Sequence, residues 1–152
     1  MPGFLFLLDR KGNTPLKDIS IKFNSLTHLQ NDRIIYSNLF IERFTNKKFL
    51  KDKIFLEDNN SIVCNEGIVL NFKDLMNRYA AKNYFDLIKK LYNKYNERFF
   101  AQFKGEFSGI FYDKIKKRCI LYTNRTSSKP LYYYLSNDYF IAASELKVVT
   151  KM

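Results

Sequence analysis

Few side chains in this sequence could act as nucleophiles or metal ligands. There are two cysteines, Cys64 and Cys119, and one histidine, His28. Both cysteines lie within apolar segments that we predict to be strands, where a thiol packs as a small hydrophobic side chain. Two cysteines make neither a disulfide framework nor a metal cluster. One histidine without a nearby partner in the sequence gives little support for a zinc site or a Cys–His pair.

An ordered series of motifs runs from Gly105 to Lys147. The motifs are G-E-F-S-G-I-F-Y-D at 105–113, C-I-L-Y-T-N-R at 119–125, K-P-L-Y-Y at 129–133 and A-A-S-E-L-K at 142–147. In residue type, order and spacing they resemble the latter part of the glutamine amidotransferase domain of the asparagine synthetase family. The resemblance implies an α+β fold of the N-terminal nucleophile (Ntn) hydrolase type, an α-β-β-α sandwich of two antiparallel sheets. In that family further strands follow the last motif.

The resemblance also implies a reaction, the hydrolysis of glutamine by a cysteine that follows the initiator methionine. The free amine of that cysteine serves as the base. In this sequence the nucleophile position is Pro2. Proline offers a secondary amine but neither a thiol nor a hydroxyl group. We therefore expect the fold to be present and the glutaminase chemistry to be missing.

The family's oxyanion donors come from an N-G-E motif. Here the aligned residues are Asn65, Glu66 and Gly67, in altered order. The negative side chain of Glu66 would oppose the formation of an oxyanion. We predict that this segment forms a tight turn between a strand and a loop. If Asn65 points into the former pocket, Cys64 points into the core, because neighbouring residues of a strand face opposite sides.

Two charged residues of the family bind the substrate's own charges. The arginine for the glutamine carboxylate falls at Asn38, with Arg33 and Arg43 out of register. The aspartate for the α-amino group falls at Tyr84. Neither Asn38 nor Tyr84 supplies the charge that such a contact needs. We expect all of these pocket positions to be degenerate.

We therefore predict a catalytically inactive domain that structurally supports an ATP-dependent, amide-forming enzyme similar to asparagine synthetase. The implied partner is an ATP pyrophosphatase domain, in the same chain or in another. ATP and magnesium are implied for that partner, and we expect no cofactor or metal in this chain. The residues that we expect to face the partner are Asn124, Arg125 and Lys129.

Two alternatives stay open. One is an active glutaminase half of such an enzyme with an unusual nucleophile, for which Cys64 is the best candidate. The other is a nucleic-acid-binding module, because the formal net charge is +11. Tyrosines at 132–134 and basic residues at 114–118 would permit base stacking and phosphate contacts. The lysines, however, are spread over turns and polar helix faces, which is typical of a solvated surface.

The composition is that of a globular protein. The chain has 152 residues, of which 46% are hydrophobic, enough for a single domain with a core of its own. No apolar run approaches the roughly 20 residues of a membrane helix. We therefore predict a cytoplasmic protein that does not associate with a membrane.

The pattern of apolar residues predicts strands, then two helices, then strands again. The first strand covers 3–8, and a half-buried strand covers Lys17–Phe23. Asn24–Asp32 reads as a loop, and strands at Arg33–Arg43 and Lys47–Glu57 join at 44–46. The remaining elements are a strand at Ser61–Cys64, a helix after Asn71, a helix at about Asn83–Asn96, strands at 106–112, 118–123, 131–135 and 139–143, and a short helix capped by Ser144.

Overall fold

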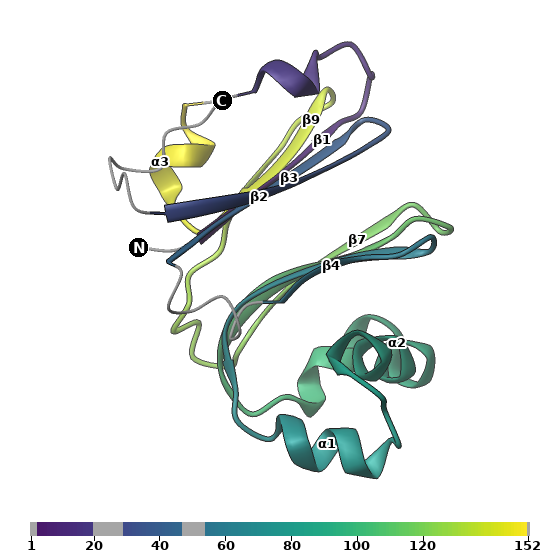
Figure 1. Cartoon of the computed structure of the whole chain (residues 1–152). Coiled ribbons are helices and arrows are strands. Elements are labelled where there is room, and N and C mark those ends of the chain that lie inside the picture. Colours follow the sequence, from purple (N-terminus) through teal and green to yellow (C-terminus); the bar gives the residue numbers. More distant parts are fainter. Residues whose placement is uncertain (1–2, 20–28, 47–53, 152) are drawn as a thin grey trace. The chain divides into compact units, whose positions relative to one another are not determined.

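The computed structural model describes residues 3–19, 29–46 and 54–151. Contacts divide the chain into two compact units (Figure 1). Unit 1 combines Met1–Lys51 with Pro130–Met152, and unit 2 is the continuous segment Asp52–Lys129. Each unit contains one antiparallel sheet. The single-domain organisation that the sequence suggests stays a prediction.

Unit 1 is built around the first strand. This strand, β1, is apolar along nearly its whole length, which suits a central position in a sheet. It pairs with β3 on one side and with β9 on the other. The strands follow the order β2-β3-β1-β9-β8, with bounds β1 Gly3–Asp9, β2 Leu29–Tyr36, β3 Leu39–Asn46, β8 Tyr132–Leu135 and β9 Tyr139–Ala143.

Two short helices pack on one face of this sheet. They are η1, Leu16–Asp18, and α3, Leu146–Val149. The residues buried between them and the sheet are mostly aliphatic: Leu5, Leu7, Leu16, Phe40, Ile141, Ala143 and Val148. Ser144 does not cap α3 as predicted, because the helix begins one residue later, after Glu145. The Ser144 hydroxyl instead accepts the backbone N–H of Phe4 at 3.0 Å and so fastens β1.

Unit 2 contains a four-stranded sheet in the order β4-β5-β6-β7. Its strands are β4 Ile54–Glu57, β5 Ser61–Val69, β6 Gly105–Asp113 and β7 Arg118–Thr123. Between β5 and β6 the chain forms α1, Phe72–Arg78, α2, Tyr84–Tyr95, and the 3-10 helix η3, Asn96–Gln102. Figure 1 shows α1 and α2 together on one side of this sheet.

The sequence predicts α2 well because its signals are local. Apolar side chains recur at spacings of three and four, and Leu87, Ile88 and Leu91 are buried as expected. Asn83 caps the helix, and its side-chain oxygen accepts the N–H of Asp86 at 2.9 Å. Asn71 precedes α1 as predicted, but its side chain bonds the backbone of Gln102 and Lys104 rather than capping the helix.

Aromatic rings fill the core between the helices and the sheet of unit 2. Phe99 is fully buried and packs edge-on against Tyr122, with ring centroids 5.2 Å apart. Phe111 lies 5.5 Å from Phe99, and Phe103 lies 5.6 Å from Phe107. Such tilted and edge-to-face pairs stabilise beyond the area they bury. The shape of this core therefore depends on how several rings fit together.

Several predicted boundaries are wrong in the first half of the chain. The predicted strand Arg33–Arg43 is two strands, because the chain turns at Ser37 and Asn38, where Ser37 has a φ of 53°. β2 begins at Leu29, inside the predicted loop, and 44–46 continue β3 instead of joining two strands. Residues 17 and 18 of the predicted strand at Lys17–Phe23 belong instead to the helix η1, and 20–23 lie outside the described residues.

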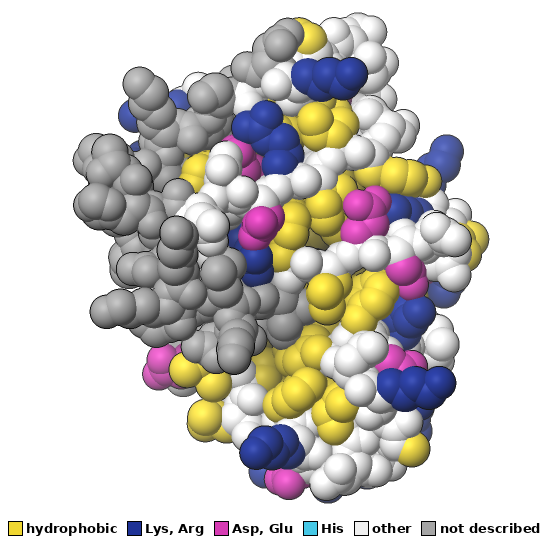
Figure 2. Space-filling view, viewed as in Figure 1, with side chains coloured by type: hydrophobic (Ala, Val, Ile, Leu, Met, Phe, Trp, Pro, Cys, Tyr) yellow, Lys and Arg dark blue, Asp and Glu magenta, His cyan; other side chains and the backbone are white. Residues whose placement is uncertain are grey.

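Neither unit gathers its Lys and Arg side chains into one patch on the face drawn in Figure 2. They are spread there among hydrophobic and acidic side chains. Of the helices within the described ranges, none has both the length and the apolar character needed to span a membrane.

Candidate functional site

Asn65 lies in the middle of β5, not in a turn as predicted. It pairs with Gly109 of β6, and its side-chain oxygen accepts the Tyr122 hydroxyl at 3.1 Å. Both side chains are almost completely buried, on the face of the sheet that the helices cover. Gly109 makes this contact possible, because a Cβ there would stand 2.5 Å from the Tyr122 ring. The amide of Asn65 is therefore a member of the core.

Glu66 and Gly67 continue the same strand. Glu66 pairs with Ser108, and alternation along the strand turns it away from the helix-covered face. Gly67 has a φ of 94°, and a Cβ at this position would meet the backbone oxygen of Glu106 at 2.0 Å. Glycine is thus required at Gly67 by backbone conformation and by close approach. The turn that the sequence predicts here begins later, at Leu70 and Asn71.

Tyr84 is the first residue of α2 and belongs to the aromatic core. Its ring stacks on Phe72 with centroids 4.5 Å apart, and Phe103 lies 6.2 Å away. Its hydroxyl is buried without a hydrogen-bond partner in the described chain, and burial raises the pKa of the phenol. Burial also raises the pKa of Tyr122 well above its usual value, and the nearby Tyr84 adds to that rise. The phenols of Tyr84 and Tyr122 are therefore uncharged at neutral pH.

Asn38 lies in the turn between β2 and β3. Its side-chain amide donates to the backbone oxygen of Asp9, which is the last residue of β1. Position 2 directly precedes the other end of β1. At about 3.3 Å per residue, these two ends of the strand are about 20 Å apart. Asn38 therefore fastens the turn between β2 and β3 to the end of β1. The position that the resemblance assigns to the nucleophile lies at the opposite end of that strand.

Arg43 is the arginine that lies beside the beginning of β1. It pairs in register with Phe4, and its neighbour Phe44 pairs with Gly3. The residue is 7% exposed, and its guanidinium forms an ion pair with Asp32 of β2. The sequence places Arg43 out of register with the family's arginine, and the alignment of that arginine with Asn38 stays a prediction.

The two cysteines are poor candidates for a replacement nucleophile. Cys64 is 1% exposed and pairs with Ile110, and it faces away from Asn65 by strand alternation. Burial raises the pKa of the Cys119 thiol to about 12, which leaves very little of the reactive thiolate at neutral pH. Pro2 and His28 lie outside the described residues. Within the described ranges, no cluster of three or more His, Cys, Asp or Glu side chains is arranged to hold a metal ion.

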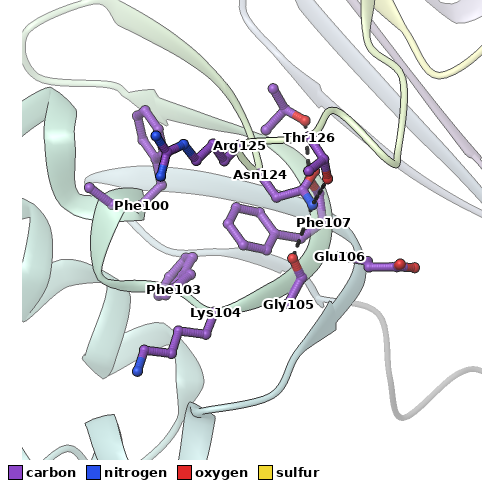
Figure 3. A pocket seen from close by; sticks show the side chains of 11 residues that line it. Phe100, Phe103, Lys104, Gly105, Glu106, Phe107, Asn124, Arg125 and Thr126 are labelled. Carbon is purple, nitrogen blue, oxygen red and sulfur yellow. Dashed lines mark hydrogen bonds between the residues drawn. The ribbon is translucent and has the colours of Figure 1, made fainter.

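A pocket of about 640 Å³ opens at one edge of unit 2 (Figure 3). Its floor consists of the rings of Phe100, Phe103 and Phe107. The wall comes from 104–106, and the rim from Thr123, the last residue of β7, and the three residues after it. Two of the residues that we expected to face a partner, Asn124 and Arg125, belong to this rim, whereas Lys129 does not line the pocket.

Asn124 organises the rim. Its side-chain nitrogen donates to the backbone oxygen of Gly105 at 3.1 Å, and it lies 3.0 Å from the hydroxyl oxygens of Thr126 and Ser128. Its side-chain oxygen accepts the N–H of Ser128 at 3.1 Å. This set of contacts fixes the rim loop to the start of β6. Arg125 is consequently presented from a well-braced segment of backbone.

Comparison with known proteins identifies the fold and the family. The family described as the glutamine amidotransferase domain matches residues 51–151, which is more than half of the chain. This chain belongs to that family. A relative from Methanocaldococcus jannaschii, named putative asparagine synthetase [glutamine-hydrolyzing] 2, is 29% identical over 106 residues. That alignment covers 64% of this chain and 21% of the relative, so the chain spans about a fifth of the relative's length.

A solved structure shares the fold. It is the glutamine phosphoribosylpyrophosphate amidotransferase from B. subtilis, complexed with ADP and GMP. The TM-score is 0.58 at 11% sequence identity, over 97% of this chain and 37% of that one. The match confirms the predicted α+β fold of the Ntn-hydrolase type. The class II amidotransferase resemblance read from the motifs is confirmed as well.

In this glutamine amidotransferase domain, the residues aligned with the family's site fall into separate surroundings. Asn65 and Tyr84 lie in the aromatic core of unit 2, near Tyr122. In unit 1, Asn38 directly precedes β3, and Arg43, which is out of register with the family's arginine, lies within that strand. Within each unit, these residues are occupied by internal packing or internal hydrogen bonds.

Proposed function

We propose that this amidotransferase domain has lost glutaminase activity and supports an ATP-dependent, amide-forming enzyme of the asparagine synthetase kind. The observation that carries the proposal is the residue directly before β1, which is Pro2. The resemblance places the thiol nucleophile at that position. Without a thiol or hydroxyl group, no covalent intermediate with the glutamine side chain can form there.

The surroundings of Asn65 and Tyr84 support the loss of a glutamine pocket. The Asn65 amide is held by Tyr122 inside the core, so it is not presented to a substrate oxyanion. A glutamine ammonium group needs a carboxylate partner, and Tyr84 offers a buried phenol whose pKa is raised. A neutral phenol is a weak substitute for an aspartate.

Unit 1 adds a third argument. Arg43 could bind a substrate carboxylate by its position beside β1, but the Asp32 carboxylate already pairs with it. A glutamine carboxylate would have to displace Asp32 from a side chain that is largely buried. The pair thus supports a role for Arg43 in holding β2 to β3 rather than in binding substrate.

The partner is inferred from the relative. That protein is named as a glutamine-hydrolysing asparagine synthetase, and it is several times longer than the part that this chain matches. An ATP pyrophosphatase domain, in the same chain or in another, would activate a carboxylate with ATP for attack by an amine. If the amine belongs to the substrate itself, no ammonia from glutamine is required, and an inactive amidotransferase domain suffices.

A glutaminase assay tests the loss of activity. We expect the purified protein to release no ammonia from glutamine, and we expect Pro2→Cys to stay inactive, because Asn65, Tyr84 and Arg43 remain engaged. Intact-mass measurement should verify that the initiator methionine is removed from Pro2→Cys, and Pro2→Ala serves as the control. Ammonia release by the unaltered protein, lost in Cys64→Ser, would establish the alternative of an active glutaminase.

Affinity purification from the source cells tests the supporting role. We expect mass spectrometry of the purified material to find an ATP pyrophosphatase-type synthetase, as a continuation of the chain or as a separate subunit. Recovery of nucleic acid with no such synthetase would contradict the proposal and favour a binding module. Salt titration would then distinguish phosphate binding, because such binding weakens steeply with salt.

A further inference from the structure

The pocket at the edge of unit 2 is not part of the family-derived site. None of the positions aligned with the glutamine pocket lines it. Two cationic residues, Lys104 and Arg125, do line it, and both are exposed. Neither forms an ion pair with a described residue. Figure 3 shows them extending from two sides of the pocket, whereas Glu106 points away from the rings.

The floor of the pocket is suited to an aromatic ring. Phe103 and Phe107 meet edge to face, at an interplanar angle of 85°. Phe100 stacks on the buried Tyr122, with centroids 5.6 Å apart and an interplanar angle of 15°. Phe103 and Phe107 are 7% and 2% exposed, whereas Phe100 is partly exposed, so a further ring entering the pocket would pack chiefly against Phe100. The packing behind these rings holds the floor in place.

The rim is suited to acidic groups. The chain as a whole has a formal net charge of +11, and Lys104 and Arg125 add unpaired positive charge next to an apolar floor. An apolar pocket bordered by arginine is a frequent centre of protein–protein interfaces. Charge complementarity around such a centre favours an acidic partner.

We propose that this pocket is a docking site for an aromatic side chain of a partner polypeptide, with acidic residues next to that aromatic residue. Lys104 belongs to the wall and Arg125 to the rim on another side, so an occupant reaches both only if it extends from the floor along the wall and out over the rim. A polypeptide segment does this more readily than a small aromatic acid. The inference rests on the proposed supporting function, to which it adds a surface and the chemistry of the partner.

The braced rim strengthens this assignment. Because Asn124 fixes the loop through its contacts with Gly105, Thr126 and Ser128, Arg125 needs little ordering of its backbone on binding. Ordering costs reduce affinity in protein association. A preformed rim therefore leaves more of the contact energy available for holding the partner.

Peptide selection tests the proposal directly. A phage-displayed library of random nine-residue peptides is panned against the purified protein, and enriched peptides are synthesised. We expect them to carry Phe, Tyr or Trp with Asp or Glu within two positions. Arg125→Gln should weaken binding about tenfold, as loss of an interface centre does. Arg98→Gln is the matched control, because Arg98 is exposed on the adjacent helix η3 but does not line the pocket.

Amide chemical shifts show where the peptide binds. We expect shifts at 100–107 and 123–126, and loss of binding when the aromatic residue of the peptide is replaced by alanine. Equal binding by Arg125→Gln and the unaltered protein would overturn the proposal, as would enriched peptides without the aromatic–acidic pattern. Displacement of the peptide by free phenylacetate at a similar concentration would instead assign the pocket to small aromatic acids.

The two proposals fail separately. Glutaminase activity of the unaltered protein would overturn the lost activity and leave peptide binding as measured. Recovery of a synthetase partner whose binding is unchanged by Arg125→Gln would keep the supporting function and remove this pocket as its docking site.

Discussion

The two units handle the positions compared with the family's site in different ways. In unit 1 the aligned position is the neutral Asn38, and charged side chains near it pair with one another, Arg43 with Asp32 and Glu42 with Arg33. In unit 2 the aligned residues Asn65 and Tyr84 lie in a neutral aromatic core, where Tyr122 bonds Asn65 and Tyr84 stacks on Phe72. The sheet of unit 2 therefore holds both residues by packing and by a hydrogen bond inside its core. The sheet of unit 1 instead satisfies its charges between neighbouring strands.

The largest difference between the units should appear at two glycines with positive φ. In unit 2, Gly67→Ala forces a Cβ into the backbone of Glu106, so we expect the free energy of unfolding to fall by about 3 kcal/mol or more. In unit 1, Gly12→Ala meets no atom within 4 Å and should cost only about 1 kcal/mol of conformational strain. Urea denaturation measures both, and equal losses would show that crowding at Gly67 does not matter.

A second comparison uses two buried tyrosines within unit 2. Tyr122→Phe removes the donor to Asn65 and leaves a buried amide oxygen without that bond, so we expect a loss of about 1–2 kcal/mol. Tyr84→Phe removes a hydroxyl that has no partner in the described chain and should be neutral or slightly stabilising. If Tyr84→Phe destabilised the protein as much as Tyr122→Phe, the polar contacts of this core would have to be reassigned.

The charged pair of unit 1 should respond to salt. We expect Asp32→Asn to lower the free energy of unfolding by about 1 kcal/mol, because Arg43 is largely buried while Asp32 is partly exposed. The loss should shrink at high salt, which screens the exposed side of the pair. Asp138→Asn breaks the exposed pair with Lys11 and serves as the control, with almost no loss expected. Identical losses at low and high salt would argue against an electrostatic origin.

The smallest expected effect is a change in the free energy of unfolding at acidic pH. The hydrogen bond from the Thr14 side chain, with the backbone N–H groups of Thr14, Gly12 and Lys11, lowers the pKa of Asp9 from 3.8 to about 2, although burial opposes the shift. A lowered pKa in the folded state stabilises the protein above the unfolded value, and this stabilisation disappears as the pH falls toward the folded value. Between pH 3.8 and pH 2, Asp9→Asn should therefore lose less stability than the unaltered protein. Parallel urea midpoints for the two proteins would contradict this.

The second half of the fold follows from local sequence signals, and the first half does not. The helix at Tyr84–Tyr95 has a cap and an amphipathic pattern, and the strands from 105 to 143 carry the family motifs. The turn at Ser37 and Asn38 has neither glycine nor proline, and Ser and Asn are weaker turn signals that do not indicate a positive φ at the serine. At Gly67 the opposite error arose, because a turn was predicted where the strand continues. This glycine is needed for close contact with the backbone of Glu106, and glycine in a sequence is also a signal for a turn.

The family was predictable from the order of the motifs, and the geometry around the candidate residues was not. Asn124 and Arg125 line a pocket, and their contact with a partner stays a prediction. The hydrogen bond from Tyr122 to Asn65 depends on the space beside Gly109, which a side chain would fill. Asn65 and Gly109 pair across neighbouring strands although 44 positions separate them in the sequence. The position of Arg43 beside Phe4 could be known only from the register of β3 against β1. Both facts belong to pairing between distant segments, which no short motif encodes.

The discontinuity of unit 1 bears on the order in which the protein is made and folds. Unit 2 is one uninterrupted segment of the chain. In unit 1, β1 can complete its pairing only after β9 has been synthesised, because Leu5 pairs with Ala143. At a synthesis rate of about 5–20 residues per second, that partner emerges roughly 7–28 s after β1. We expect unit 2 to gain protease resistance on the ribosome first. Until the later strand is made, one edge of the apolar β1 stays open to wrong partners, so early chaperone contact should centre on the first residues of the chain.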